Sequence, residues 1–99
     1  MFPINEYKDK IQKICRNNGV KRLELVGSAG REDFQINRSD VDVLVEFEGN
    51  ERLFDRYFEL KKQLEESLGR KVDVIQYGAV KNPFVRRSIE QNKVHIYGT

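Results

Sequence analysis

Two aspartates, Asp40 and Asp42, stand two residues apart in the run SDVDVLVEF. Side chains at i and i+2 of a β-strand project from the same face, with backbones about 6–7 Å apart. Two anions this close repel each other and resist desolvation. Mg²⁺ relieves such repulsion, because it prefers oxygen ligands and is held by one or two carboxylates plus substrate phosphates. Two such ions, about 3.5–4 Å apart, serve in-line phosphoryl or nucleotidyl displacement.

A third aspartate, Asp73, is the lone carboxylate of the apolar run KVDVI. If its strand lies beside the strand of Asp42, Asp73 joins the first two aspartates. It could then bind a catalytic metal and help to deprotonate an attacking hydroxyl. The alternative is an outward-facing acid on a half-exposed strand, and the sequence leaves both open.

The dipeptide Gly27-Ser28 stands where a strand ends and a short helical turn begins. Glycine lets the backbone turn closely, and exposed N–H groups at such a turn suit a phosphate. A plain turn explains Gly-Ser equally well. The dipeptide becomes informative about function through its position, because a spacer of eleven residues (29–39) separates it from the Asp-x-Asp motif.

Periodicity predicts the elements that must position these residues. Residues 4–17 carry apolar side chains at helical spacing, with Cys15 on the apolar stripe, and Asn18-Gly19 ends that helix. Strands are predicted over 20–27, 41–47, 71–77 and 94–98, and alternation places Asp40 and Asp42 opposite Val41 and its buried neighbours.

Two further helices are predicted, over 51–68 and from Pro83 to about Asn92. Gly49-Asn50 is read as the start signal of the first of them, and Gly69 as its stop. The leucines of this helix form a clean stripe, which Phe54 and Phe58 are expected to widen. The fold class that follows is α+β, a small mixed β-sheet packed with α-helices in a single domain, residues 1–99. A parallel crossover between the second and third strands is possible, and strand order stays open.

Composition narrows the class of protein. The chain has 99 residues, 38% hydrophobic and 34% charged, without an apolar run of the ~18 residues that a membrane span needs. Its start, MFPINEYKDK, lacks the apolar core of a signal peptide. The single cysteine excludes an intramolecular disulfide, and we read Cys15 as a core residue and His95 as structural. We therefore expect a cytoplasmic protein without membrane association.

The net charge of +2 hides an asymmetry. Residues 70–99 contain six Lys or Arg and two acidic residues, a balance of 6 − 2 = +4, whereas the remainder has 12 − 14 = −2. A basic C-terminal third suits a phosphate, a nucleic acid or an acidic partner. A solvated helix face carrying Arg86 and Arg87 explains it as well.

The combined pattern resembles the nucleotidyltransferase superfamily that includes DNA polymerase β, whose signature is Gly-Ser, a spacer, Asp-x-Asp and a later carboxylate on a strand. More closely, the chain resembles the minimal nucleotidyltransferases (MNT), the MntA-like antitoxins. The segments that carry the resemblance are LELVGSAGRE, SDVDVLVEFE, GRKVDVI and KNPFVRRSIEQNKVHIYG, which together span most of the chain.

The resemblance implies a nucleotidyltransferase fold, binding of a nucleoside triphosphate with Mg²⁺, and transfer of its nucleotidyl group to a hydroxyl. MNT proteins pair with HEPN-type RNase toxins, and characterised members transfer AMP from ATP to a toxin tyrosine. By position, Gly27 and Ser28 would hold the triphosphate, Asp40 and Asp42 the metals, Asp73 the catalytic metal, and Arg31 a phosphate or a packing contact. Glu32 departs from the glycine usual after that arginine, in a loop about one residue longer.

Two other functions remain open. One is a non-catalytic antitoxin that masks its partner, which the three carboxylates argue against. The other is nucleotidyl transfer to a nucleic acid or small molecule, for which the chain is short and would need a partner subunit. We do not expect direct nucleic-acid binding, and we expect the chain to associate with itself or with its partner.

Overall fold

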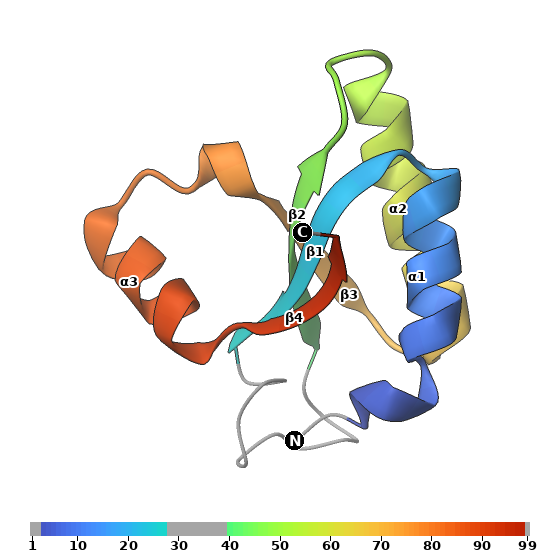
Figure 1. Cartoon of the computed structure of the whole chain (residues 1–99), viewed down its shortest axis with the longest axis horizontal. Coiled ribbons are helices and arrows are strands. Elements are labelled where there is room, and N and C mark those ends of the chain that lie inside the picture. Colours follow the sequence, from blue (N-terminus) through green and yellow to red (C-terminus); the bar gives the residue numbers. More distant parts are fainter. Residues whose placement is uncertain (1–2, 28–39, 99) are drawn as a thin grey trace.

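The computed structural model describes residues 3–27 and 40–98 (Figure 1). The predicted turn over 28–39 lies outside them. The elements, in chain order, are a 3-10 helix at Ile4–Glu6, α1 (Lys8–Asn17), β1 (Val20–Val26), β2 (Val41–Phe47), α2 (Leu53–Leu68), β3 (Val72–Gln76), a 3-10 helix at Tyr77–Ala79, α3 (Pro83–Asn92) and β4 (Val94–Gly98).

The four strands form one mixed sheet in the order β3-β2-β1-β4. β1 is antiparallel to both β2 and β4, and β2 is parallel to β3. A parallel pair needs a crossover connection, which α2 supplies. The mixed sheet expected from the sequence is therefore confirmed, and the parallel crossover that the sequence left open is present.

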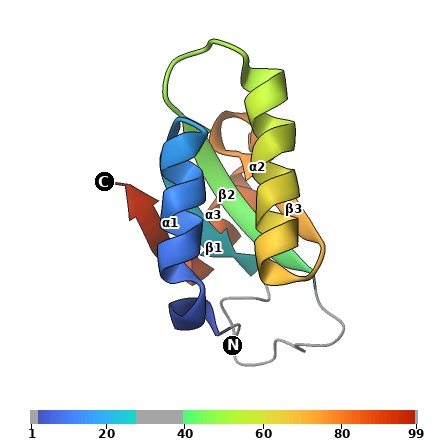
Figure 2. The same ribbon diagram turned by 90° about the vertical axis from the view of Figure 1, so that its right-hand side faces the viewer.

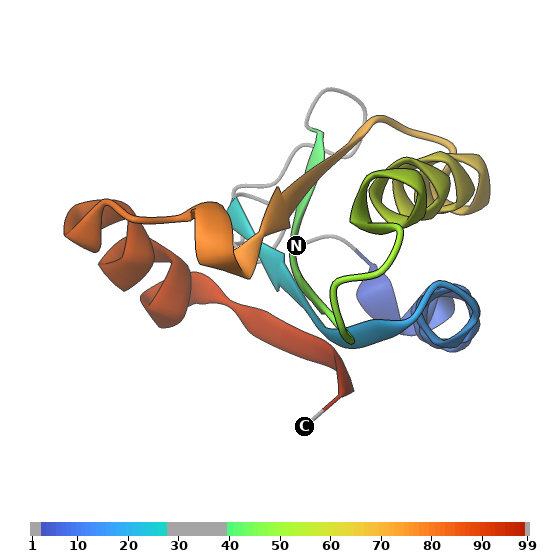
Figure 3. The same cartoon turned by 90° about the horizontal axis from the view of Figure 1, so that it is seen from above.

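The two faces of the sheet are covered differently. α1 and α2 lie together on one face, and α3 lies on the opposite side (Figures 1 and 3). Viewed from the right of Figure 1, α1 and α2 stand side by side in front of the strands (Figure 2). We call the face under α1 and α2 the packed face; its core consists of Ile11, Cys15, Val20, Leu23, Leu25, Val41, Val43, Val45, Leu60, Leu64, Leu68, Val72, Val74 and Ile96.

α1 buries the apolar stripe that its periodicity predicts. Ile11 is 2% exposed and Cys15 is fully buried. Burial raises the pKa of the Cys15 thiol to about 12, so the thiolate needed for a nucleophile is scarce at neutral pH. Cys15 is therefore a core residue, as expected.

The start of α2 differs from the one that the sequence predicts. The helix begins at Leu53 behind Arg52, a residue with φ of +52° and no side-chain capping bond, so Asn50 is not its cap. The side chain of Arg56 makes the capping region rigid instead, because its donors reach four backbone carbonyls, those of Asn18, Gly19, Glu48 and Glu51. Gly69 ends the helix in the left-handed conformation, as predicted.

The apolar stripe of α2 is narrower than predicted. Leu60, Leu64 and Leu68 are buried, but Phe54 and Phe58 are 74% and 50% exposed. Their rings pack on each other, 4.6 Å apart, rather than into the core. Phe58 also meets the ring of Tyr57, 5.2 Å between ring centres, so the three rings form a cluster at the surface of α2.

α3 forms where the sequence places it. Oδ1 of Asn82 accepts hydrogen bonds from the backbone N–H of Phe84 (2.9 Å) and of Val85 (3.3 Å), and Pro83 occupies the first turn. These are strong local start signals. In spite of them, the helix contains no buried residue. Local capping therefore holds its conformation, and contacts other than core packing must hold its position.

Across residues 3–27 and 40–98, every helix is too short or too polar to cross a lipid bilayer.

Candidate functional site

Asp42 and Asp73 lie directly beside each other on the sheet. β2 and β3 are parallel, and their register pairs Asp42 with Asp73, between the pairs Val41–Val72 and Val43–Val74. The valines at positions 41, 43, 72 and 74 all belong to the core of the packed face, so the two aspartates project from the opposite face. We call this opposite face the site face.

The electrostatics of the pair show how close the two groups are. Burial raises the pKa of Asp42, and the charge of Asp73, the hydrogen bond between the two carboxyl groups and the charge of Asp40 raise it further. Asp42 is half-buried, whereas Asp73 is exposed. The arrangement therefore concentrates negative charge where solvent, a cation or a ligand has access.

Asp40 stands just outside β2 and is exposed. Its charge reaches Asp42, yet in the part of the chain that the structure describes no three acidic, histidine or cysteine side chains are grouped closely enough to hold a metal ion. The described ligands are thus a close pair, Asp42 and Asp73, with Asp40 at its margin. A pair fits Mg²⁺, which takes its remaining ligands from water and from substrate phosphates.

Gly27 directly follows β1 and lies against the carboxylate of Asp42. It follows Val26, the register partner of Asp42, and its φ is +64°. A Cβ added to Gly27 would lie 2.6 Å from Oδ2 of Asp42. Glycine is therefore required here for two reasons, its left-handed backbone and the close approach of the Asp42 carboxylate. The need for a flexible backbone at this turn was predictable from the sequence, whereas the close approach of the Asp42 carboxylate was not.

The other predicted nucleotide-binding residues, Ser28 and Arg31, lie outside the described residues, as does Glu32. Their roles remain predictions. Gly27, the last described residue before them, lies next to the carboxylate of Asp42.

α3 borders a pocket beside Gly27 that sequence reasoning missed. A pocket of about 210 Å³ lies between Gly27 and one side of α3, lined by Val85, Ser88, Ile89 and Asn92. The spacing of these four residues along the helix is one turn or close to it, so they share a face. This spacing was available in the sequence, but nothing in the sequence indicated that it would face Gly27.

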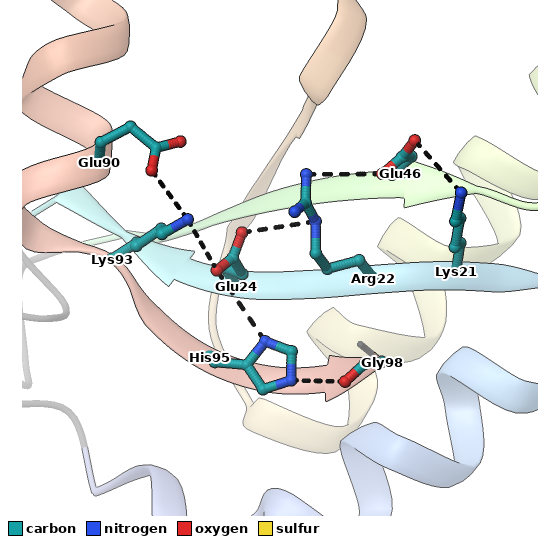
Figure 4. A network of polar contacts seen from close by, with 8 residues as sticks. All are labelled: Lys21, Arg22, Glu24, Glu46, Glu90, Lys93, His95 and Gly98. Atoms are coloured by element: carbon teal, nitrogen blue, oxygen red, sulfur yellow. Dashed lines mark hydrogen bonds and ion pairs between the residues drawn. The ribbon is translucent and has the colours of Figure 1, made fainter.

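A buried ionic network connects α3 with the sheet (Figure 4). Glu24, on the site face of β1, is only 3% exposed. Its carboxylate lies 3.5 Å from Nζ of Lys93, which follows α3, and 3.7 Å from Nε of Arg22. Lys93 also pairs with Glu90 of α3 at 2.9 Å, and Arg22 with Glu46 of β2 at 3.5 Å. The network compensates a carboxylate that would otherwise be costly to bury.

His95 belongs to the margin of this network. Its Nδ1 lies 3.9 Å from the Glu24 carboxylate, and its Nε2 is hydrogen-bonded to the carbonyl oxygen of Gly98 at 2.7 Å. The first contact links β4 to β1 and the second lies within β4, which agrees with the structural role predicted for His95. Alternation along β1 predicted that Glu24 faces away from Leu25, but only the tertiary structure shows that Glu24 is buried.

Comparison with known proteins places this geometry in a family. A family model described as a nucleotidyltransferase domain matches residues 8–96. Relatives from Methanocaldococcus jannaschii carry the name "Putative protein adenylyltransferase". One is 38% identical over 100 residues, covering 97% of this chain and 100% of the relative; another is 41% identical over 93 residues, covering 94% and 97%.

Solved structures agree with the fold. A structure described as a minimal nucleotidyltransferase superposes with a TM-score of 0.77 at 26% identity, covering 92% of this chain and 90% of that one. The MNT antitoxin complexed with a tri-AMPylated HEPN toxin of Shewanella oneidensis gives a TM-score of 0.69 at 20% identity, covering 96% and 72%. The chain belongs to the nucleotidyltransferase domain family and is an enzyme of that class.

Proposed function

We propose that the chain transfers AMP from ATP, with Mg²⁺, to a tyrosine hydroxyl of a HEPN-type toxin and so acts as its antitoxin. The observation that carries the proposal is the register of β2 and β3, which puts Asp42 and Asp73 side by side, with the backbone of Gly27 next to Asp42. The protein adenylyltransferase names of the relatives support a protein acceptor, and the AMPylated toxin complex among the fold neighbours supports the partner class.

The carboxylate pair fits a magnesium site. Asp42 and Asp73 offer hard oxygen ligands on one face. Burial first, and the charge of Asp73 second, raise the pKa of Asp42, and a cation relieves both the lost hydration and the repulsion. In this proposal Asp42 and Asp73 hold the metal, with Asp40 contributing from the margin. Bound Mg²⁺ supplies charge neutralisation at the triphosphate and at the attacking oxygen.

The transfer is an in-line displacement at the α-phosphorus of ATP. The oxygen of the acceptor hydroxyl forms a bond to that phosphorus, and the bond from the phosphorus to the bridging oxygen of the β-phosphate breaks. Pyrophosphate leaves with the electron pair of the broken bond. The hydroxyl proton passes to the exposed carboxylate of Asp73 and then to solvent.

The turn after β1 holds the triphosphate in this proposal. Gly27 has no side chain, so the backbone can approach both Asp42 and a phosphate. Ser28 adds a hydroxyl donor and Arg31 a cation. The protein thus contributes mainly position and electrostatics, which suffice for phosphoryl chemistry.

The test uses the protein encoded by the neighbouring gene as acceptor. It is incubated with this chain, Mg²⁺ and each of the four nucleoside triphosphates, and the intact masses of both proteins are measured. We expect the acceptor to gain one or more AMP units with ATP, and a chelator of divalent cations to abolish the gain.

The variant Asp42→Asn isolates the site. It keeps the size of the side chain but removes a metal-binding charge, so transfer should fall at least about 100-fold. Its free energy of unfolding should be unchanged or higher, because the charged form of Asp42 is disfavoured in the folded chain. Asp9→Asn, at an exposed aspartate of α1, is the matched control and should transfer normally.

Two results would contradict the proposal. A stable complex that forms without any mass gain would favour an antitoxin that only masks its partner. Loss of folding in Asp42→Asn, read from circular dichroism, would make the aspartates structural rather than a site.

A further inference from the structure

α3 presents three different faces to its surroundings. One is anchored to the body of the protein, one borders the pocket at Gly27, and one projects outward. At 100° per residue, the anchored face is centred on Arg86 and Glu90, the pocket face on Ser88 and Asn92, and the outward face on Phe84, Arg87 and Gln91.

The anchored face combines polar contacts with a small gap that Ile89 shares with the apolar side chains of Leu44 and Val80. Nε of Arg86 donates a hydrogen bond to the carbonyl of Val80 at 2.6 Å, and its guanidinium lies 4.9 Å from the ring centre of Tyr77. Glu90 pairs with Lys93, which in turn pairs with the buried Glu24 of β1 (Figure 4). These contacts fix α3 beside the carboxylate site although none of its residues is buried.

The outward face has no counterpart in the described structure. Phe84 is 79% exposed and the neighbouring Val85 is 47% exposed. Within residues 3–27 and 40–98, the side chains of Lys81 and Arg87 make no ion pair, whereas Arg86 and Lys93 are engaged. The helix thus holds an apolar side chain between two uncompensated positive charges.

A helix with this pattern is suited to a protein segment of opposite charge. The apolar side chain offers area to bury, and Lys81 and Arg87 complement acidic groups on either side. Two free cations are few for a nucleic acid, whose binding depends on neutralising several phosphates. The charge of the face therefore favours an acceptor protein, and the pocket on the neighbouring face of the same helix places that protein near Gly27.

We propose that α3 is the docking helix for the acceptor protein. An acidic segment of the acceptor bearing an apolar side chain binds Phe84 and Arg87, and the acceptor hydroxyl then enters beside Gly27 and the carboxylates. This inference rests on the proposed function, because it requires a protein acceptor. It assigns a role to the basic C-terminal third that the nucleotidyl-transfer chemistry does not use.

The experiment measures the KM for the neighbouring gene's product at saturating ATP, and separately the Kd for a fluorescent ATP analogue. Phe84→Ala and Arg87→Glu should each raise the acceptor KM at least about tenfold, because each removes a central contact. The Kd for the ATP analogue should stay within a factor of about two of the unchanged protein, since neither side chain touches the carboxylate pair.

Matched controls come from α2, on the packed side of the sheet. Phe54→Ala removes an equally exposed phenylalanine (74%), and Lys62→Glu reverses the charge of an exposed lysine. Both should leave the acceptor KM unchanged. If the loss of any exposed apolar or positive side chain were enough to weaken binding, these two controls would raise the acceptor KM as much as the α3 variants do.

Several outcomes would overturn the docking role. One is an unchanged acceptor KM in both α3 variants while the unchanged protein transfers AMP. Others are a dimer of the chain that Phe84→Ala dissociates, measured by light scattering, and RNA binding with a steep salt dependence that Arg87→Glu abolishes. If the unchanged protein transfers nothing, the proposed function fails instead. Calorimetry then still tests the docking role, because Phe84→Ala should bind the acceptor more weakly than the unchanged protein does.

Discussion

The two faces of the sheet are built by different means. On the packed face, Leu60 and Leu64 of α2 are fully buried against strand residues such as Val45. On the site face, α3 buries none of its residues and is held by ion pairs, a capped first turn and a stacked arginine. Burial of helix side chains therefore stabilises one side, whereas polar contacts position α3 on the other side, where the strand residues Val26 and Leu44 are buried.

Because the two faces are built differently, the residues that stabilise the fold are largely not the residues of the carboxylate site. Carboxylates such as Asp42 and Asp73 would be costly under a packed helix, because each would lose its hydration. The open site face keeps them accessible, while the valines on the reverse of the same strands fix their positions. Only a few positions on the site face are tightly constrained, and Gly27 is the clearest of them.

The largest effect on stability is expected on the packed face. Leu64→Ala should lower the free energy of unfolding by about 3 kcal/mol, because it leaves a cavity in the core. Phe84→Ala on α3 should change it by less than about 0.5 kcal/mol. Urea denaturation measures both. Equal losses in the two variants would show that α3 is part of the core after all.

An intermediate effect is expected at Gly27. Gly27→Ala should cost roughly 2 kcal/mol, part from the left-handed backbone and part from contact with Asp42, and transfer should fall at least about tenfold as the carboxylate shifts. Thermal unfolding and the AMP-transfer assay measure the two losses.

Gly49→Ala is the control for that variant. Gly49 has the same φ, +64°, but nothing lies within 4 Å of its added Cβ. It should therefore show the backbone cost alone, with normal transfer. If Gly27→Ala behaves identically, the close approach to Asp42 has no consequence for the site.

The smallest effect concerns a polar contact beneath the site. The Glu65 carboxylate accepts a hydrogen bond from the N–H of Val72, the residue before Asp73, at 3.0 Å, and lies 3.3 Å from Nζ of Lys61. The Val72 hydrogen bond first, and Lys61 second, lower the pKa of Glu65 below its usual 4.5. A lowered folded-state pKa stabilises the fold above the unfolded value, and this stabilisation is lost as the pH falls through the folded value.

Glu65→Gln should therefore lower the free energy of unfolding at neutral pH by roughly 0.5–1 kcal/mol. The difference from the unchanged protein should shrink as the pH falls below about 4.5. Urea denaturation across that range measures it, and Glu66→Gln, at an exposed neighbour, should show neither effect. A difference that grows in acid would reverse the sign of the linkage.

Much of the local structure follows from the sequence, because it depends on near neighbours. Helical spacing predicted α1 and the leucine stripe of α2, Pro83 predicted the start of α3, and alternation placed Asp42 opposite Val43. The start of α2 was wrong, because Arg56 stabilises that turn through carbonyls of distant segments that no local signal reveals.

The sequence alone determined which residue types the site contains and that Asp42 and Asp73 each lie on a strand. Only the tertiary structure decided that β3 pairs with β2 in the register that joins them, that Glu24 is buried, and that α3 stands across from Gly27. The physical reason is that periodicity records which face of an element is apolar. Strand order, register and the position of a polar-anchored helix arise from contacts between segments far apart in the chain.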